Sequence, residues 1–226
     1  QDWRADPVMV RLVHLGGVQG AWLADSPDVE DEYDSDPCAR ATALFDLEAE
    51  KLAKVFSAVR IARLEIDAIY DAAIHDPWFA NFDWQGFSQD ELSLVPVVVA
   101  VEGADRAAGP DMRSFSRLLS SGRPVQILIR VQPSNNPAAG PGENPFQDFR
   151  TELGYLGLGH RQAAVTQSSA SRFGHLTECF LSSLDATRTS LHLINTGMRA
   201  IHSLVALNAW LIAGAAIEGR AHPFFR

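Results

Sequence analysis

Four polar segments follow apolar stretches of this chain, and each carries groups that could bind a ligand. Their carboxylates, amides and hydroxyls accept or donate hydrogen bonds and coordinate hard cations. If the apolar stretches are parallel strands, their carboxyl ends meet at one edge of a sheet, where such sheets bind ligands. The sequence therefore predicts a ligand site built from residues 102–105, 132–140, 167–171 and 195–197.

Ser168 and Ser169, together with His175, have the residue types of a nucleophile and its base. The segment has no G-x-S-x-G elbow, and no acid that would orient the histidine is identifiable, so a hydrolase is not the favoured interpretation. The seven histidines form no HxH or HExxH pattern, which leaves a zinc site without support. The glycines form no dinucleotide-binding fingerprint.

Strands that alternate with helices must position these segments. Residues 95–101 form a continuous apolar run, typical of a strand buried on both faces of a parallel sheet, and residues 125–131 are predicted to form a second buried strand. Further strands are predicted at 8–15, 163–167 and 190–195, and helices at 39–75, 110–121, 149–158, 173–184 and 198–217. The alternation predicts an α/β fold, a three-layer parallel sheet flanked by helices with right-handed crossovers.

Residues 1–90 are predicted to form an N-terminal extension packed on an α/β domain at residues 91–226. The extension contains the first strand, an acidic loop at residues 25–37, and one long helix, or two in sequence, that Pro77 ends. A solvated face is the favoured interpretation of the acidic loop, and helix-end packing that of the following aromatic cluster. This cluster consists of Trp78, Phe79, Phe82, Trp84 and Phe87.

Net charge, cysteine count and the length of the apolar runs exclude several kinds of partner and cofactor. The net charge is −9 and the 19 Lys and Arg residues are scattered, which argues against nucleic acid. Cys38 and Cys179 are far apart and predicted to be free thiols, which excludes a local iron–sulfur cluster and fits a reducing cytoplasm. The longest apolar run, residues 204–217, is shorter than the ~20 residues of a bilayer span, so no membrane insertion is expected.

Three stretches, in the same order, resemble the thiamine-diphosphate-binding domain of the pyruvate:ferredoxin (2-oxoacid:ferredoxin) oxidoreductase family. The first is FSRLLSSGRPVQILI at residues 115–129, which a Ser-Asn loop and a glycine follow. The second is LGHRQAAVTQ at residues 158–167, and the third is AAIEGRAHPFFR at residues 215–226. The resemblance covers roughly residues 95–226 and implies the thiamine-diphosphate-binding fold for them.

The resemblance also implies a site for thiamine diphosphate and magnesium. Its cofactor-binding residues would be Gly103, Asp105, Ser134, Asn135, Asn136 and Gly140, with Asp105 and Asn135 as magnesium ligands. The family's metal-binding aspartate in a Gly-Asp-Gly turn corresponds to Ala104 here, with Asp105 one step along. Near Val131 and Gln132, the family's Asp-Thr pair is also replaced.

In the family, the catalytic glutamate and the iron–sulfur clusters come from other domains. The chain is therefore expected to act within a larger oxidoreductase, with other domains or subunits or a second copy as partners, and to be inactive alone. It begins at Gln1 without an initiator Met or a signal region, which suggests a fragment of a longer protein. The alternative is a degenerate, non-catalytic domain that keeps the fold for interdomain or subunit assembly; a separate nucleotide binder is the third possibility.

Overall fold

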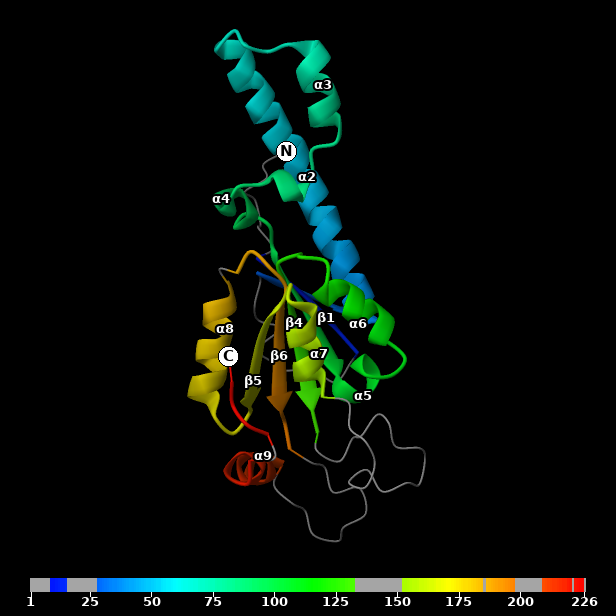
Figure 1. The fold of residues 1–226 in the computed structure, drawn as a ribbon, viewed down its shortest axis with the longest axis vertical. Coiled ribbons are helices and arrows are strands. Elements are labelled where there is room, and N and C mark those ends of the chain that lie inside the picture. Colours follow the sequence, from blue (N-terminus) through cyan, green and yellow to red (C-terminus); the bar gives the residue numbers. More distant parts are fainter. Residues whose placement is uncertain are drawn as a thin grey trace.

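A six-stranded, all-parallel sheet with helices on both faces forms the body of the protein (Figure 1). The structure is a computed structural model that describes residues 9–15, 28–132, 152–184, 186–197, 209–220 and 222–225. The strands are β1 (Val10–His14), β2 (Val29–Tyr33), β3 (Val97–Gly103), β4 (Val125–Val131), β5 (Ala164–Ser169) and β6 (Ser190–Asn195), in the order β2-β1-β3-β4-β6-β5. The predicted α/β class with a parallel sheet is confirmed.

The register brings the carboxyl ends of the strands into line. Gly103 of β3 lies opposite Arg130 of β4, while Asn195 of β6 lies between Val131 of β4 and Ser169 of β5. β1 pairs with both β2 and β3, so two strands from the predicted extension belong to this sheet. The sheet therefore continues across the boundary predicted at residue 90.

The acidic segment predicted as a loop contains the edge strand β2. It was expected to be solvated because of its charge, and Glu30 and Asp31 are exposed; its carboxylates also pair with cations on neighbouring elements. Glu30 pairs with Arg11 of β1, and Glu32 with Arg40 at 2.9 Å. These pairs offset repulsion along the strand, and charged side chains are common on edge strands because they discourage further pairing.

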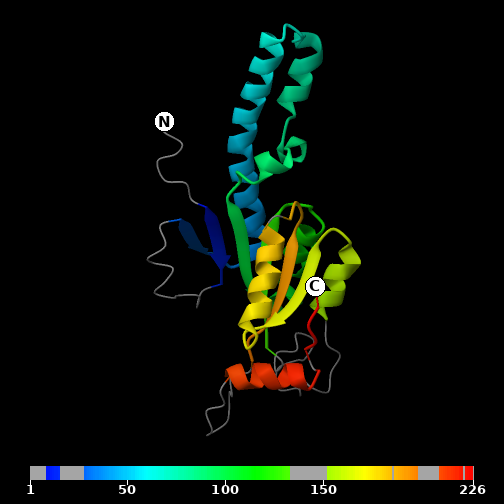
Figure 2. The same ribbon diagram turned by 90° about the vertical axis from the view of Figure 1, so that its left-hand side faces the viewer.

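Helix α2 (Pro37–Ile66) is longer than the sheet is deep. Its 30 residues span ~45 Å, whereas a seven-residue strand such as β3 spans ~23 Å. The first half packs on the sheet, with Ala53 as its last buried residue, and the second half projects beyond the sheet as an arm beside α3 (Ala72–Ala80) (Figures 1 and 2).

The structure has two helices in sequence, the second of the two predicted alternatives, whereas the predicted end at Pro77 is wrong because α3 continues to Ala80. α2 ends at Ile66, the backbone of Ala68 has a φ of +56°, and Asp71 caps α3 by accepting a hydrogen bond from the Ala73 amide at 2.9 Å. Pro77 lies inside α3. A new N-cap restarts the helix four residues after the C-cap, a local signal that outweighs the helical periodicity of the sequence.

The remaining helices cover the sheet and its edges. They are α4 (Gln89–Leu92), α5 (Ala104–Ala107), α6 (Met112–Leu119), α7 (Leu153–His160), α8 (Phe173–Leu184) and α9 (Ala209–Glu218), with the short 3-10 helix η1 (Trp84–Gly86). α8 lies on the face opposite α2 and α6, and α9 lies beyond the carboxyl ends of the strands (Figure 2). Helix α9 matches the last part of the predicted 198–217 helix; residues 198–208 lie outside the described residues.

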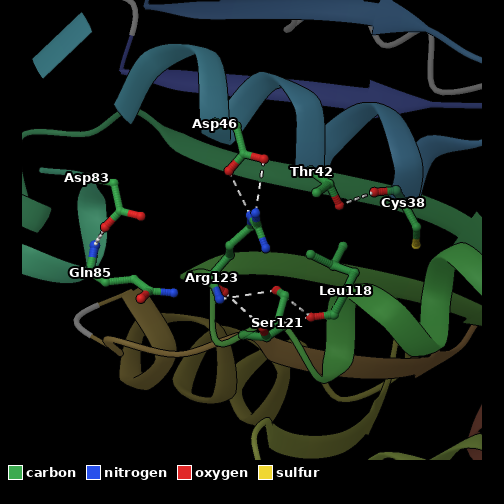
Figure 3. Close-up of polar contacts among 9 residues, drawn as sticks. Cys38, Thr42, Asp46, Asp83, Gln85, Leu118, Ser121 and Arg123 are labelled. Carbon is green, nitrogen blue, oxygen red and sulfur yellow. Dashed lines mark hydrogen bonds and ion pairs between the residues drawn. The ribbon is translucent and has the colours of Figure 1, made fainter. Parts of the chain in front are cut away.

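Two kinds of contact hold α2 on the body. Arg123, just before β4, donates two hydrogen bonds to the Asp46 carboxylate, at 2.8 and 3.0 Å (Figure 3). The aromatic cluster packs around the helix, with Trp84 edge-on to Phe45 and Phe87 edge-on to Phe56.

Among the described residues, no helix combines the length and the apolar character that a membrane span requires.

Candidate functional site

The direction of winding reverses between β1 and β3. The chain passes from β1 outward to β2 on one side, and from β3 to β4 on the other. In open α/β sheets the ligand crevice lies outside the carboxyl ends of the two strands at such a reversal. The residues at the end of β3 are therefore the first place to look for a site.

Glu102, near the end of β3, lies in the interior of the protein. Its side chain is fully buried, and one carboxyl oxygen accepts a hydrogen bond from the Cys38 thiol at 3.2 Å. Cys38 is in the first turn of α2 and is also fully buried. This contact joins the start of α2 to the carboxyl end of β3.

The surroundings of Glu102 favour its protonated form. Burial is the largest of the effects that raise the pKa of Glu102 to about 8; the neighbouring carboxylates of Asp111 and Asp36 act in the same direction, and the Cys38 hydrogen bond opposes them. The second oxygen of Glu102 has no hydrogen-bond partner within the described part of the chain, and a proton on this carboxyl would allow it to donate toward Asp111. Burial also raises the pKa of the Cys38 thiol, well above its usual value.

Asp111 and Arg106 close this cluster on its outer side. Asp111 is buried and accepts a hydrogen bond from Arg106 at 2.7 Å. Arg106 also donates to the Ser35 carbonyl at 2.8 Å, which links it to the segment before α2. We call Cys38, Glu102 and Asp111 the buried acid cluster. It is held by three elements and cannot supply a reactive thiolate at neutral pH.

The predicted magnesium-binding turn is the first turn of a helix. Gly103 ends β3 and α5 begins at Ala104, a residue with no ligand atom. Asp105 is exposed, and its carboxylate folds back over Gly103, close to where a side chain at that position would begin. The described part of the predicted clamp thus offers one carboxylate, whereas magnesium requires near-octahedral coordination. Within the described ranges, no three acidic, histidine or cysteine side chains converge as a metal site.

The other four predicted cofactor residues cannot be compared with the structure. Ser134, Asn135, Asn136 and Gly140 lie outside the described residues, as does the loop that contains them. The proposed metal pair of Asp105 and Asn135 therefore stays a prediction.

Two buried donors lie at the end of β6. Asn195 is fully buried; its side-chain oxygen accepts a hydrogen bond from the Gly197 amide at 2.8 Å, and its side-chain nitrogen has no partner among the described residues. The Thr196 hydroxyl is likewise buried and unpartnered. Because unpaired buried donors are costly, this position on the carboxyl edge is suited to an acceptor such as a carbonyl or phosphate oxygen.

The structure does bring Ser168 and His175 together. The Ser168 hydroxyl lies 2.9 Å from Nδ1 of His175, whose ring stacks on Phe224 at 4.3 Å. Ser168 is only 1% exposed, because the C-terminal segment pairs with β5 through Gln167 and Phe225 and covers it. A nucleophile requires access to its substrate, so this pair is better suited to holding the C-terminal segment in place.

Sequence reasoning missed Cys38 and Asp111 as neighbours of Glu102. The signal that was present is the position of Glu102, a lone acid at the end of an otherwise apolar strand, which requires buried partners. Which partners it finds depends on how α2 and α6 pack.

Comparison with known proteins gives no family assignment. No family model matches the chain. No curated protein matches it either.

Proposed function

We propose that this chain is a thiamine-diphosphate-binding-like domain that has kept its fold for assembly within a larger 2-oxoacid:ferredoxin oxidoreductase-like protein. Two observations support kinship: the order of the three resembling stretches, and the parallel α/β sheet on which they lie. Because the catalytic glutamate and the iron–sulfur clusters of such enzymes belong to other domains, this domain would contribute contacts rather than turnover.

The buried acid cluster is the observation that carries the non-catalytic form of the proposal. A ligand crevice at the β1/β3 reversal needs open space and outward-facing polar groups. Here Glu102 and Cys38 are fully buried in contact with each other at the end of β3. These two side chains thus bind each other and are not exposed to a ligand at this end of β3.

Titration calorimetry with thiamine diphosphate and magnesium tests this proposal. It should be run on the chain alone and with the domain that carries the catalytic glutamate. We expect no binding heat up to millimolar cofactor in either case. Saturable heat at one cofactor per chain would overturn the non-catalytic proposal.

A second candidate is a domain that still binds thiamine diphosphate and magnesium. The unpartnered donors of Asn195 and Thr196 favour it, because they lie on the same sheet edge as Gly103 and Asp105. If cofactor binds, D105N should weaken binding at least about tenfold by removing a charged ligand. D90N, which removes a carboxylate from the exposed Asp90 of α4, is the matched control and should leave affinity unchanged.

A further inference from the structure

Two cavities lie where the chain returns from α3 toward the body of the protein (Figure 1). The first, of about 330 Å³, is lined by Pro77, Trp78, Asn81, Phe82, Asp83 and Gly86. The second, of about 280 Å³, shares Phe82 and Asp83 with the first and adds Trp84 and the Asp46 and Glu50 carboxylates of α2. We call these two cavities the arm cavities. Their walls combine aromatic rings with carboxylates.

Aromatic rings and carboxylates together are suited to binding organic cations. The face of a ring attracts a guanidinium or ammonium group, and a carboxylate adds a charged hydrogen bond. The protein already uses two of these rings in this way: the Arg60 guanidinium lies 4.5 Å from the ring centre of Phe82, and that of Arg123 lies 5.6 Å from Trp84. Trp78 is 52% exposed and, among the described residues, has no cation against its ring. It is therefore the ring that is available to a cation from another molecule.

Asp83 is the available carboxylate in the same cavity. One of its oxygens accepts a hydrogen bond from the Gln85 amide at 2.9 Å (Figure 3). Its side chain is exposed and forms no ion pair within the described ranges. By contrast, both carboxylates that α2 contributes already have cationic partners. A cation that entered beside Trp78 would therefore find its counter-charge in Asp83.

The segment that carries the arm cavities is strongly acidic. Residues 64–101 contain no Lys or Arg and seven carboxylates: Glu65, Asp67, Asp71, Asp76, Asp83, Asp90 and Glu91. Of these, only Glu91 forms an ion pair in the described part of the chain, with Arg60. Such a segment attracts cations and repels anions, so nucleic acid, an anionic lipid surface and a second copy with net charge −9 are disfavoured as partners.

We propose that the arm cavities bind an arginine or lysine side chain from a basic segment of a partner protein. The cationic group lies against Trp78 and pairs with Asp83. A segment is favoured over a single small cation because the unpaired carboxylates continue along α3, which is ~14 Å long, and can meet further basic residues. The site needs neither thiamine diphosphate nor a catalytic role, so its failure would leave the proposed function untouched.

Titration calorimetry of the 226-residue chain with a model peptide tests the chemistry. The probe is an acetylated, amidated peptide of alternating glycine and arginine, and its control replaces each arginine with citrulline, which has a similar shape and no charge. We expect saturable binding of one arginine peptide per chain, weaker in high salt, and binding of the citrulline peptide that is at least about tenfold weaker. Equal binding of the two peptides, or no heat with millimolar arginine peptide, would overturn the proposal.

Substitutions in the cavity test the location. D83N removes the charge but keeps an oxygen that can cap η1, and W78L keeps apolar bulk but loses the ring face. Each should weaken peptide binding about threefold to fivefold, and the double variant at least about tenfold. D67N is the matched control, because Asp67 is an exposed carboxylate on the same arm, at the C-cap of α2 and outside both cavities. It should leave the affinity within about 1.5-fold.

Urea unfolding midpoints show whether the variants remain folded, and D83N alone decides the location if W78L does not fold. Binding that D83N leaves unchanged, or that D67N weakens to the same extent, would show that the peptide responds only to net charge and would overturn the site.

Two further measurements distinguish a basic segment from other occupants. Arginine amide should bind at least about tenfold more weakly than the peptide, because it can fill only one position; equal affinities would indicate a site for a small cation. Sedimentation equilibrium of the chain alone should give an association state that W78L does not change. A dimer that W78L weakens would place a second copy in the arm cavities and contradict the proposal.

Discussion

At the scale of single residues, burial decides what Glu102 and Cys38 can do. A carboxyl removed from water keeps its proton, and a thiol beside it keeps its own, so each can satisfy the other by hydrogen bonding. The same two residue types on the surface would be an anion and a titratable nucleophile. Their burial makes them part of the packing between α2 and β3.

Glu102 should make the protein less stable as the pH rises. Its pKa is about 8 in the folded protein and near its ordinary value in the unfolded chain, so between these values the folded state holds the extra proton. The unfolding free energy therefore decreases through this range. E102Q, which keeps the shape and cannot ionise, should remove this decrease and be more stable than wild type above pH 8 by roughly 2–4 kcal/mol in urea unfolding.

The matched control for E102Q is E178Q, because Glu178 is exposed on α8. It should leave the pH profile unchanged. A wild-type profile that does not fall between pH 5 and pH 8 would contradict the pKa assigned to Glu102.

At the scale of elements, α2 depends on a few contacts that anchor its first half. The bidentate Asp46–Arg123 pair connects it to the segment before β4 (Figure 3). Arg123 also lies 5.6 Å from the ring centre of Trp84. Thr42 adds a hydrogen bond to the Cys38 carbonyl within the helix at 2.8 Å. A helix whose outer half projects from the body needs such an anchor at its base.

R123K should lower the unfolding free energy by about 0.5–1 kcal/mol. Lysine keeps the charge but loses the paired donors and the planar group beside Trp84, and partial exposure of the ion pair limits the cost. R117K, on the exposed side of α6, is the control and should be neutral. Equal unfolding midpoints for the two variants would show that the anchor does not depend on the guanidinium.

At the scale of the whole molecule, a buried polar network joins the sheet to α8. His192 of β6 lies 2.8 Å from the Gln126 side chain of β4 and 2.7 Å from the Thr166 hydroxyl of β5. Ser183 of α8 lies 3.1 Å from the same ring. Burial lowers the pKa of His192 to about 4, so its ring is neutral in the folded protein.

Because His192 is buried with a lowered pKa, the free energy of unfolding should decrease as the pH falls. Between pH 6.5 and pH 4 the unfolded chain binds a proton that the folded protein does not, so stability falls as the pH falls, by up to about 3 kcal/mol. An NMR titration of the folded protein should show the His192 ring neutral down to about pH 4.5, unlike an exposed histidine. A midpoint near 6.5 for His192 would contradict this assignment.

Several parts of the fold could be read from the sequence because their signals are local. Strands β4 and β6 and helix α8 have the predicted bounds, since short, mainly apolar segments and a helical repeat bounded by polar residues require no knowledge of neighbours. The edge strand β2 could not be predicted this way. Its acidic residues become compatible with a strand only when cations from β1 and α2 lie beside them.

By itself, the sequence determined the alternation of strands and helices, and with it the edge of the sheet where the polar segments gather. Only the tertiary structure decided that Cys38 and Asp111 lie next to Glu102, and that the outer half of α2 projects with Val55, Val59 and Ile66 exposed. The physical reason is the distance along the chain over which each interaction acts. Periodicity and turn chemistry act over a few residues, whereas the contacts of Glu102 join segments 64 residues apart in the chain, and only packing brings them together.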